Sequence, residues 1–205
     1  MTNPTLFVHG NGASADSWYS TIAHLMDKGV NRDCLYTIDF DGPGTEHHTM
    51  SNEIDKRVKE IRSRHKKPVN LVGHSLGATG IRYWLEDKDR YDWVDTVVYI
   101  AGALHGTSVC SLRGMLSDDM CRPCNLISRS AMTDEDNILA QLNDGDETPG
   151  DVDHYTIRSI WDRCFILNPL SPTLDGATNV SIPSSHTGVL EHEMTHEYLY
   201  NWLYQ

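Results

Sequence analysis

The sequence predicts a compact α/β fold in which about six mostly parallel strands form one sheet and helices cover both of its faces. Short apolar runs alternate with amphipathic helical patterns along the chain, an order that implies parallel strands joined by right-handed crossovers. Most of the strand-like runs are apolar throughout, as expected when both faces of a sheet are buried. The 205 residues suit a single domain, residues 1–205, with a sizeable core.

The first half of the chain supplies four of the expected strands. They are predicted at residues 5–8, 34–40, 68–72 and 94–101. A helix with one apolar face is predicted over residues 15–28, with Gly29 as its stop, and Ser51 is a candidate N-cap for the next helix. A third helix, carrying Ile81 and Trp84, is predicted between the last two of these strands.

The second half contains two more predicted strands and a long irregular excursion. The strands are expected at residues 154–160 and 179–182, and a final helix is expected over residues 191–203. Residues 105–153 are rich in Pro and Gly turns, with one helix expected near residues 134–142. This excursion joins the fourth and fifth strands, so it leaves the carboxyl edge of the sheet, where ligands bind in such folds. We therefore expect it to border the active site.

Composition and charge exclude several classes of partner. The formal net charge is −12, whereas nucleic-acid binding and docking on anionic membranes favour a basic face. No apolar run approaches the roughly 20 residues that a membrane span requires. We expect a monomer that binds neither nucleic acid nor membranes integrally. No leader peptide is visible at the start of the sequence, so we expect either a cytoplasmic protein or a secreted mature form.

Five cysteines leave at least one thiol unpaired in any disulfide scheme. Cys110, Cys121 and Cys124 cluster within the excursion, whereas Cys34 and Cys164 lie elsewhere. The cluster is compatible with a disulfide, with three free thiols, or with a partial zinc site for which His105 is the nearby fourth ligand.

The residues 73–77, Gly-His-Ser-Leu-Gly, match the pattern G-x-S-x-G. They follow a predicted strand and precede a predicted helix, which is the context of the nucleophile elbow in the α/β-hydrolase fold. The tight turn exposes the hydroxyl of Ser75 at the carboxyl edge of the sheet and at a helix N-terminus, where developing negative charge is favoured. Ser75 is therefore the predicted nucleophile, and a plain glycine-rich turn with a capping serine is the alternative.

A serine nucleophile also requires donors for the oxyanion that forms during acyl transfer. The backbone N–H of Leu76, directly after the nucleophile, is one candidate. The second donor normally lies in the loop after the first core strand, here His-Gly-Asn-Gly at residues 9–12. The N–H of Asn11 is therefore the second candidate, although an ordinary turn between strand and helix would have a similar sequence.

The predicted base is His186 and the predicted acid is Asp162. In this fold the acid and then the histidine follow the serine along the chain, and His186 lies in the loop between the last strand and the last helix. His105, His154, His192 and His196 are less well placed. Asp162 ends the preceding strand, whereas its rival Asp175 precedes Gly176 in a predicted turn, where aspartate usually serves the turn itself.

The residues 192–196, His-Glu-Met-Thr-His, match the zinc motif H-E-x-x-H. A catalytic zinc site needs a third protein ligand and an open position. Only nine residues follow this motif, with no later histidine and only Glu197 as a later carboxylate. We interpret the match as a coincidence on a terminal amphipathic helix, and we expect neither a metal nor a cofactor.

Several segments resemble the small microbial lipases of lipase class 2, related to the minimal bacterial lipase A type. The resemblance extends from about residue 6 to residue 190. It is carried by Phe-Val-His-Gly at 7–10, the serine pentapeptide, His-Gly-Thr at 105–107, and residues 142–150, 174–180 and 186–190. It implies an α/β-hydrolase without a cofactor, with Ser75, Asp162 and His186 as triad and Asn11 and Leu76 as oxyanion donors. Ala-Gly-Ala-Leu before His105 departs from the family pattern, which leaves the acyl pocket and its substrate open.

The sequence therefore predicts a serine hydrolase, a lipase or carboxylesterase that cleaves acyl esters through an acyl-enzyme on Ser75. A polyester depolymerase or a thioesterase would use the same triad. A non-catalytic binding protein on a hydrolase scaffold is the alternative from another class, and the complete set of predicted catalytic residues argues against it. The polar, turn-rich excursion favours soluble esters of short or medium chain length, with little activation at an oil–water interface.

Overall fold

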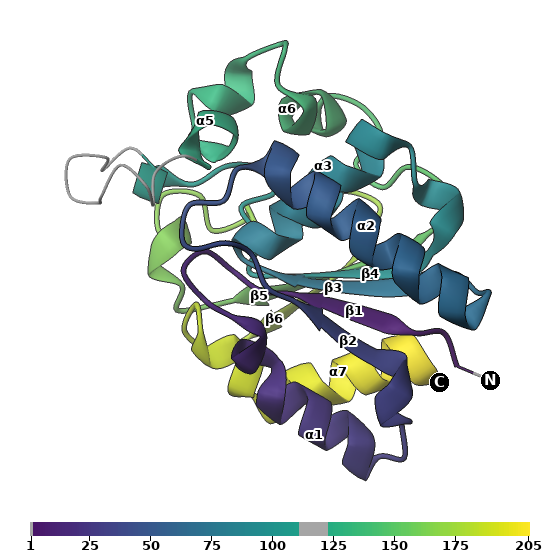
Figure 1. The fold of residues 1–205 in the computed structure, drawn as a ribbon. Coiled ribbons are helices and arrows are strands. Elements are labelled where there is room, and N and C mark those ends of the chain that lie inside the picture. The colour runs from purple at the N-terminus through teal and green to yellow at the C-terminus, as the bar shows by residue number, and fades with distance from the viewer. Residues whose placement is uncertain (1, 111–122) are drawn as a thin grey trace.

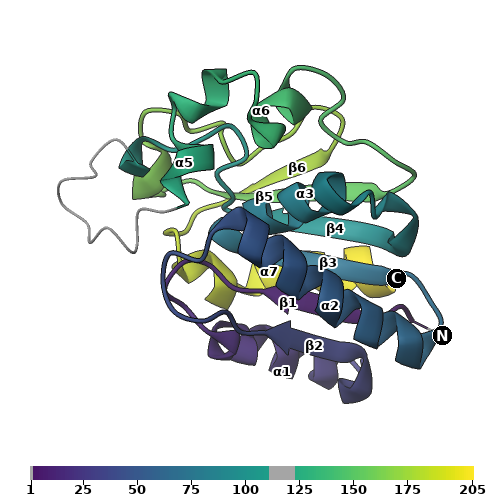
Figure 2. The ribbon, with the colours of Figure 1, turned by 45° about the horizontal axis from the view of Figure 1, so that its top comes forward.

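A computed structural model describes residues 2–110 and 123–205 of the chain. Its centre is one six-stranded sheet in the order β2-β1-β3-β4-β5-β6, with every neighbouring pair parallel. Figure 2 shows the strands side by side in this order. The sheet confirms the predicted α/β class. The strands are β1 (Thr5–Val8), β2 (Leu35–Ile38), β3 (Val69–His74), β4 (Val94–Ile100), β5 (Asp153–Ser159) and β6 (Thr178–Ile182).

Helices cover both faces of this sheet. Figure 1 shows α2 and α3 on one face and α1 and α7 on the other. Two short helices, α5 and α6, lie on the α3 side, within the excursion between β4 and β5. The helices are α1 (Tyr19–Asp27), α2 (His47–His65), α3 (Leu76–Lys88), α5 (Cys124–Ile127), α6 (Ile138–Asn143) and α7 (Glu193–Tyr204). Short 3₁₀ turns occupy Ala15–Trp18, Arg32–Cys34, Tyr91–Trp93, Ala131–Thr133, Arg163–Phe165 and Gly188–Glu191.

The apolar patterns explain these elements. All residues of β1 and β3 are buried, because both strands lie inside the sheet with helices above and below them. Helix α2 buries Met50, Ile54, Val58 and Ile61, whose spacing of three and four residues forms a single stripe. That stripe faces the sheet and α3, so α2 is fixed by packing despite its many charged residues.

The strand order creates a topological switch point. From β1 the chain moves outward to β2 and then returns across β1 to form β3 on its other side. The loops after β1 and β3 therefore leave neighbouring strand ends, where Val8 pairs in register with Gly73. Ligands in open α/β sheets bind at such points, outside the carboxyl ends of the strands.

The starts of α2 and β2 differ from the predicted ones. Ser51 is not an N-cap: α2 begins one turn earlier, at His47, and the buried Ser51 hydroxyl donates to Asp87 Oδ2 at 2.6 Å. His47 has no apolar signal but packs in the core, 2.9 Å from Thr79 Oγ1, so tertiary contact extends the helix. Strand β2 begins only at Leu35, because Arg32–Cys34 form a 3₁₀ turn capped by the Asn31 side chain.

The excursion contains a disulfide. Cys110 is bonded to Cys124, whereas Cys34 and Cys164 are free. Two members of the cysteine cluster are therefore unavailable as metal ligands. The third, Cys121, lies outside the described residues. The helix expected near residues 134–142 begins later, at Ile138, where the Asn137 side chain caps it.

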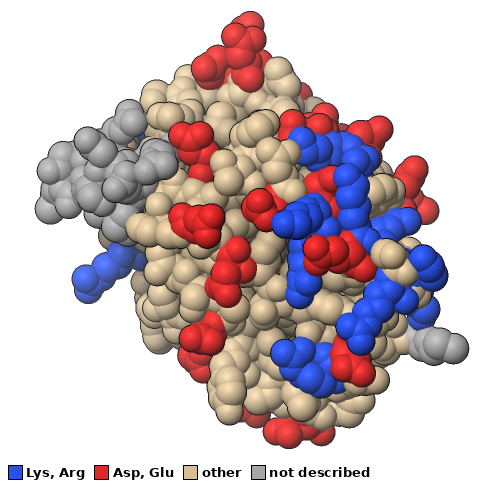
Figure 3. All heavy atoms as spheres, viewed as in Figure 1, with Lys and Arg blue, Asp and Glu red and all other residues tan. Residues whose placement is uncertain are grey.

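The surface combines both signs of charge. On the face shown in Figure 3, Lys and Arg side chains gather on the right, over α2, and acidic side chains lie among them. Ion pairs of α2 join Lys59 to Asp55 and Arg57 to Glu60. Within the parts of the chain that the structure describes, no helix is both long enough and apolar enough to cross a membrane.

Candidate active site

Ser75 occupies a strained turn between β3 and α3. Its backbone has φ 54° and ψ −118°, a region that a non-glycine residue adopts only at a cost. The turn is possible because its neighbours lack side chains: a Cβ on Gly73 would lie 2.7 Å from the Ala78 nitrogen, and one on Gly77 would collide with the Val8 carbonyl. The Ser75 N–H donates to Ile100 O at 2.9 Å. The predicted elbow geometry is therefore present.

The three predicted triad side chains form one chain of hydrogen bonds. The Ser75 hydroxyl lies 2.9 Å from His186 Nε2, and His186 Nδ1 lies 2.7 Å from Asp162 Oδ2. Asp162 follows β5 and its side chain is almost completely buried, whereas the His186 side chain is 22% exposed. The other Asp162 oxygen accepts the Cys164 N–H at 2.9 Å. Both carboxylate oxygens are thus engaged, which holds the carboxylate toward the ring.

The surroundings of His186 favour its charged form. Burial lowers the pKa of His186, but the hydrogen bonds and charges of Asp162 and Cys164 outweigh burial and raise that pKa to about 9. An imidazolium that forms when the ring takes a proton from Ser75 would be stabilised in the same way.

His74, the residue before the nucleophile, supports the His186 loop. Its Nε2–H donates to the backbone carbonyl of His186 at 2.8 Å. Burial, together with the nearby His186, lowers the pKa of His74 to about 4. His74 is therefore a neutral, buried donor that fixes the backbone of the loop that carries His186.

The two predicted oxyanion loops meet at the switch point. Asn11 and Leu76 line the same pocket as Ser75. Leu76 is the first residue of α3. The loop of Asn11 is tied to the segment after β2, because Asn11 Oδ1 accepts the Gly44 N–H at 2.6 Å and His9 Nε2 accepts the Phe40 N–H at 3.3 Å. These ties fix the backbone beside the nucleophile.

An apolar pocket of about 250 Å³ opens onto Ser75 and His186. Its wall comes from the loop after β1, the elbow, the segment after β4 with the Cys110–Cys124 disulfide, the turn after β5 and the loop after β6. The lining side chains include Leu76, Ala103, Val109, Cys110, Pro123, Cys124, Ile127, Cys164 and Phe165.

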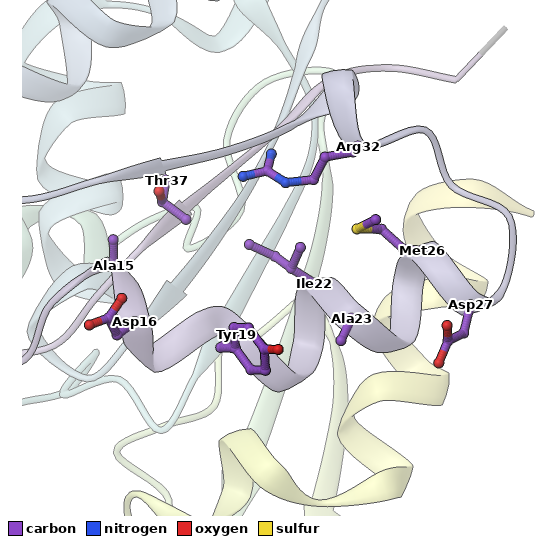
Figure 4. A pocket seen from close by; sticks show the side chains of 9 residues that line it. All are labelled: Ala15, Asp16, Tyr19, Ile22, Ala23, Met26, Asp27, Arg32 and Thr37. Atoms are coloured by element: carbon purple, nitrogen blue, oxygen red, sulfur yellow. The ribbon is translucent and has the colours of Figure 1, made fainter.

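A larger hollow of about 490 Å³ lies between α1 and the sheet. Figure 4 shows Ile22, Arg32 and Thr37 pointing into this space. None of the predicted site residues lines it. The smaller pocket is the candidate site, because of these two hollows only it is lined by the predicted nucleophile and the predicted base.

The alternative candidates for the acid and the base make other contacts in the structure. Asp175 is exposed, and its backbone N–H donates to Glu147 Oε2 at 2.6 Å. His105 pairs with Glu147 Oε1 at 2.7 Å. In the H-E-x-x-H segment, His192 caps α7 by accepting the Met194 N–H at 3.2 Å, and His196 Nε2–H donates to Leu190 O at 2.7 Å. Each of these three histidine rings therefore has a structural partner, and Asp175 is bound through its backbone.

Sequence reasoning missed two features beside the triad. One is Cys164, a free thiol that lines the pocket two residues after Asp162. The other is an exposed apolar cluster in the same connection between β5 and β6. The high frequency of large apolar residues in this loop is a sequence signal that could have revealed the cluster. Its members, each at least 52% exposed, are Ile160, Trp161, Ile166, Leu167 and Leu170.

Several solved structures with the same architecture are lipases. Mature Bacillus licheniformis lipase BlEst2 superposes with a TM-score of 0.79, at 16% identity, over 98% of this chain and 92% of that chain. A monoacylglycerol lipase from Paleococcus ferrophilus superposes with a TM-score of 0.67, at 14% identity, over 99% and 96% of the two chains. At these identities the likeness concerns the fold, and it confirms the predicted α/β-hydrolase fold.

Sequence comparison assigns the family. A putative chloroplastic methylesterase 14 from Arabidopsis thaliana is 34% identical over 88 residues, which span 40% of this chain and 24% of that protein. The chain thus matches only about a quarter of the length of this curated relative. The lipase (class 2) family, in contrast, matches residues 2–202. The resemblance seen in the sequence is therefore confirmed, and the chain belongs to the lipase (class 2) family.

Proposed function

We propose that the protein hydrolyses carboxylic esters through an acyl-enzyme on Ser75. The observation that carries this proposal is the chain of hydrogen bonds from Asp162 through His186 to Ser75, at 2.7 and 2.9 Å, which opens into an apolar pocket. A nucleophile, its base and the group that orients the base are within direct reach of one another, as acyl transfer requires.

In the proposed mechanism, His186 Nε2 takes the hydroxyl proton as Ser75 Oγ attacks the ester carbonyl. The N–H groups of Asn11 and Leu76 stabilise the tetrahedral oxyanion. His186 then gives its proton to the departing alcohol, and water attacks the acyl-enzyme with the same ring as base. Asp162 keeps the Nδ1–H tautomer and stabilises the imidazolium. This sequence of steps uses no cofactor.

The dimensions of the pocket favour acyl groups of short or medium length. Its volume of about 250 Å³ is below the roughly 300–1,000 Å³ usual for drug-sized ligands. Apolar side chains and the Cys110–Cys124 disulfide form much of the wall, so an acyl chain is a better match than a polar group.

A second candidate is the hydrolysis of insoluble esters, such as polyesters or lipid aggregates. The exposed apolar residues of the segment 160–170 favour it. Trp161, which precedes Asp162 in the chain, is 67% exposed and Leu167 is 66% exposed, and exposed apolar patches mark interaction sites. The double change Trp161→Ser and Leu167→Ser should then slow hydrolysis of an emulsion but leave a soluble ester unaffected. Equal effects on both substrates would exclude a role for this cluster in binding insoluble substrate.

Replacement of the nucleophile tests the proposal. Ser75→Ala should lower turnover of a p-nitrophenyl ester by roughly 10⁴–10⁶-fold, as is typical when a triad nucleophile is lost. A phosphonate inhibitor should add once per chain, on Ser75, in the mass spectrum of a digest. A matched thioester distinguishes an esterase from a thioesterase, and EDTA should leave both rates unchanged. More than a few per cent of residual activity in Ser75→Ala would refute the acyl-enzyme.

A further inference from the structure

We propose that Asp162, Cys164 and His186 form an inhibitory site for zinc or a similar divalent transition metal. The inhibition, though not the binding, rests on the proposed function. Within the described part of the chain, these three side chains are the one His/Cys/Asp/Glu group with metal-ligand spacing: one ligand atom from each lies within 4.8 Å of the others. Cys164 is a free thiol, and it takes part in none of the proton transfers of the proposed mechanism.

The fold holds these ligands in place before any ion arrives. Asp162 and Cys164 lie on one turn after β5, which is closed by the 2.9 Å bond from the Cys164 N–H to Asp162 Oδ1. The Cys164 carbonyl accepts a hydrogen bond from the Thr107 hydroxyl at 2.7 Å, so a residue of the excursion also holds this turn in place. His186 comes from the loop after β6, whose backbone is held by His74. An ion would thus meet a rigid set of donors.

The donor set suits a borderline or soft ion. Zinc accepts thiolate, imidazole and carboxylate ligands and is satisfied by four of them, whereas magnesium and calcium require six or more oxygen atoms. A thiolate and a carboxylate balance the two positive charges, so binding leaves no net charge in a partly buried place. Water or the Ser75 hydroxyl can occupy the fourth position. Binding releases the thiol proton and, where the His186 ring is charged, one ring proton as well, because the coordinating nitrogen must be unprotonated.

Such binding would stop catalysis whichever ring nitrogen takes the metal. Coordination through His186 Nε2 occupies the lone pair that faces Ser75 Oγ at 2.9 Å. Coordination through Nδ1 displaces the bond to Asp162 Oδ2 and moves the ring proton to Nε2. In both cases no general base remains for Ser75. The thiol beside the triad would therefore make the enzyme sensitive to metals without any catalytic metal.

Inhibition by buffered free zinc is the first test. With a soluble ester, zinc should inhibit the wild type, EDTA should restore its rate, and magnesium and calcium should have no effect. Cys164→Ser should raise the half-inhibitory zinc concentration at least roughly tenfold, with each variant compared to its own zinc-free rate. Cys34→Ser, which changes the other described free thiol, should behave as wild type. Equal zinc sensitivity of Cys164→Ser and wild type would overturn the proposal.

Binding itself is tested in Ser75→Ala protein, without reference to activity. Cadmium should produce its ultraviolet thiolate charge-transfer band, and adding either Cys164→Ser or His186→Ala should weaken that band at limiting cadmium. A lone reactive thiol predicts that His186→Ala leaves the band unchanged, which would overturn the three-ligand site. Asp162→Asn repeats the test if His186→Ala does not fold, as judged by circular dichroism. Failure of the esterase assay with a positive cadmium result would refute only the proposed function.

Discussion

Two histidine–carboxylate pairs have the same separation but differ in what the second ring nitrogen of each histidine meets. His186 is 2.7 Å from Asp162, and His105 is 2.7 Å from Glu147. The free nitrogen of His186 faces the Ser75 hydroxyl at 2.9 Å. The other nitrogen of His105 instead donates to Ser171 O at 3.3 Å. A ring held between two oxygen acceptors has no nitrogen left to take a proton from a nucleophile.

The contacts of Glu147 indicate that the His105–Glu147 pair has a structural role. Glu147 binds the His105 ring through one oxygen and the Asp175 N–H through the other. Its carbonyl accepts a bond from the buried Arg82, which also donates to Leu104 O and Asn143 Oδ1. This network ties the excursion to α3 and to the turn before β6. A short distance between a histidine and a carboxylate therefore does not identify a catalytic pair.

The largest expected effect comes from isosteric amides in the two pairs. Asp162→Asn should lower turnover at neutral pH by about 10⁴-fold, because the amide favours the wrong tautomer of His186. Glu147→Gln should change turnover by less than about tenfold, since its histidine does not touch Ser75. Turnover of one soluble ester by both variants is the measurement. A reversed order of effects would move the base to His105.

The pH dependence gives the next largest effect. The proposed mechanism requires a neutral His186, and the pKa of this residue is raised to about 9, so kcat/KM should rise about tenfold per pH unit below that value. Activity at pH 7 should then be about a hundredth of the plateau. Asp162→Asn should move the inflection to lower pH, whereas Glu147→Gln should not move it. A flat wild-type profile between pH 6 and 9 would contradict this account of the base.

Because folding raises the pKa of His186, this group also contributes to stability. That contribution is full below the unfolded value of 6.5 and is lost as pH rises through about 9. The buried His47 and His74 act in the opposite sense: burial lowers the pKa of each to about 4. Their contribution is present above pH 6.5 and is lost as pH falls toward 4.

The smallest effect is expected on stability from the non-catalytic pair. Glu147→Gln keeps one acceptor and loses the charge-assisted bonds, which should cost about 1–3 kcal/mol in the free energy of unfolding and lower the melting temperature by roughly 2–10 °C. Asp175→Asn, an exposed change in the same turn, should stay within about 0.5 kcal/mol. Thermal melts of both variants at pH 7 decide the matter. A larger loss in Asp175→Asn would refute the anchoring role of Glu147.

Local patterns in the sequence were sufficient to predict the main strands and helices. They also predicted the order in which the candidate triad residues follow one another along the chain. The apolar runs located all six strands to within a few residues, because a strand buried on both faces must be apolar along its length. Gly73 and Gly77 marked the elbow, since only residues without a side chain permit the close approach of α3 to β1. The positions of Asp162 after one strand and His186 after the next followed from the parallel topology, in which successive strands end at one edge.

Tertiary structure alone decided which groups meet across that edge. At the start of α2 the ring of His47 lies 2.9 Å from a hydroxyl distant in the sequence, Thr79 Oγ1, a contact that no local pattern predicts. Cys110 is bonded to Cys124, and Cys164 lies beside His186. The sequence left the state of the cysteine cluster open and did not indicate the position of Cys164. His105 and His186 each lie near a carboxylate. Only the way in which the strands are aligned places the Ser75 hydroxyl next to the second nitrogen of His186. The periodicity of apolar residues depends only on residues that are close in the sequence, so it predicts helices and strands. The partners of a loop side chain depend instead on how strands that are distant in the sequence are aligned.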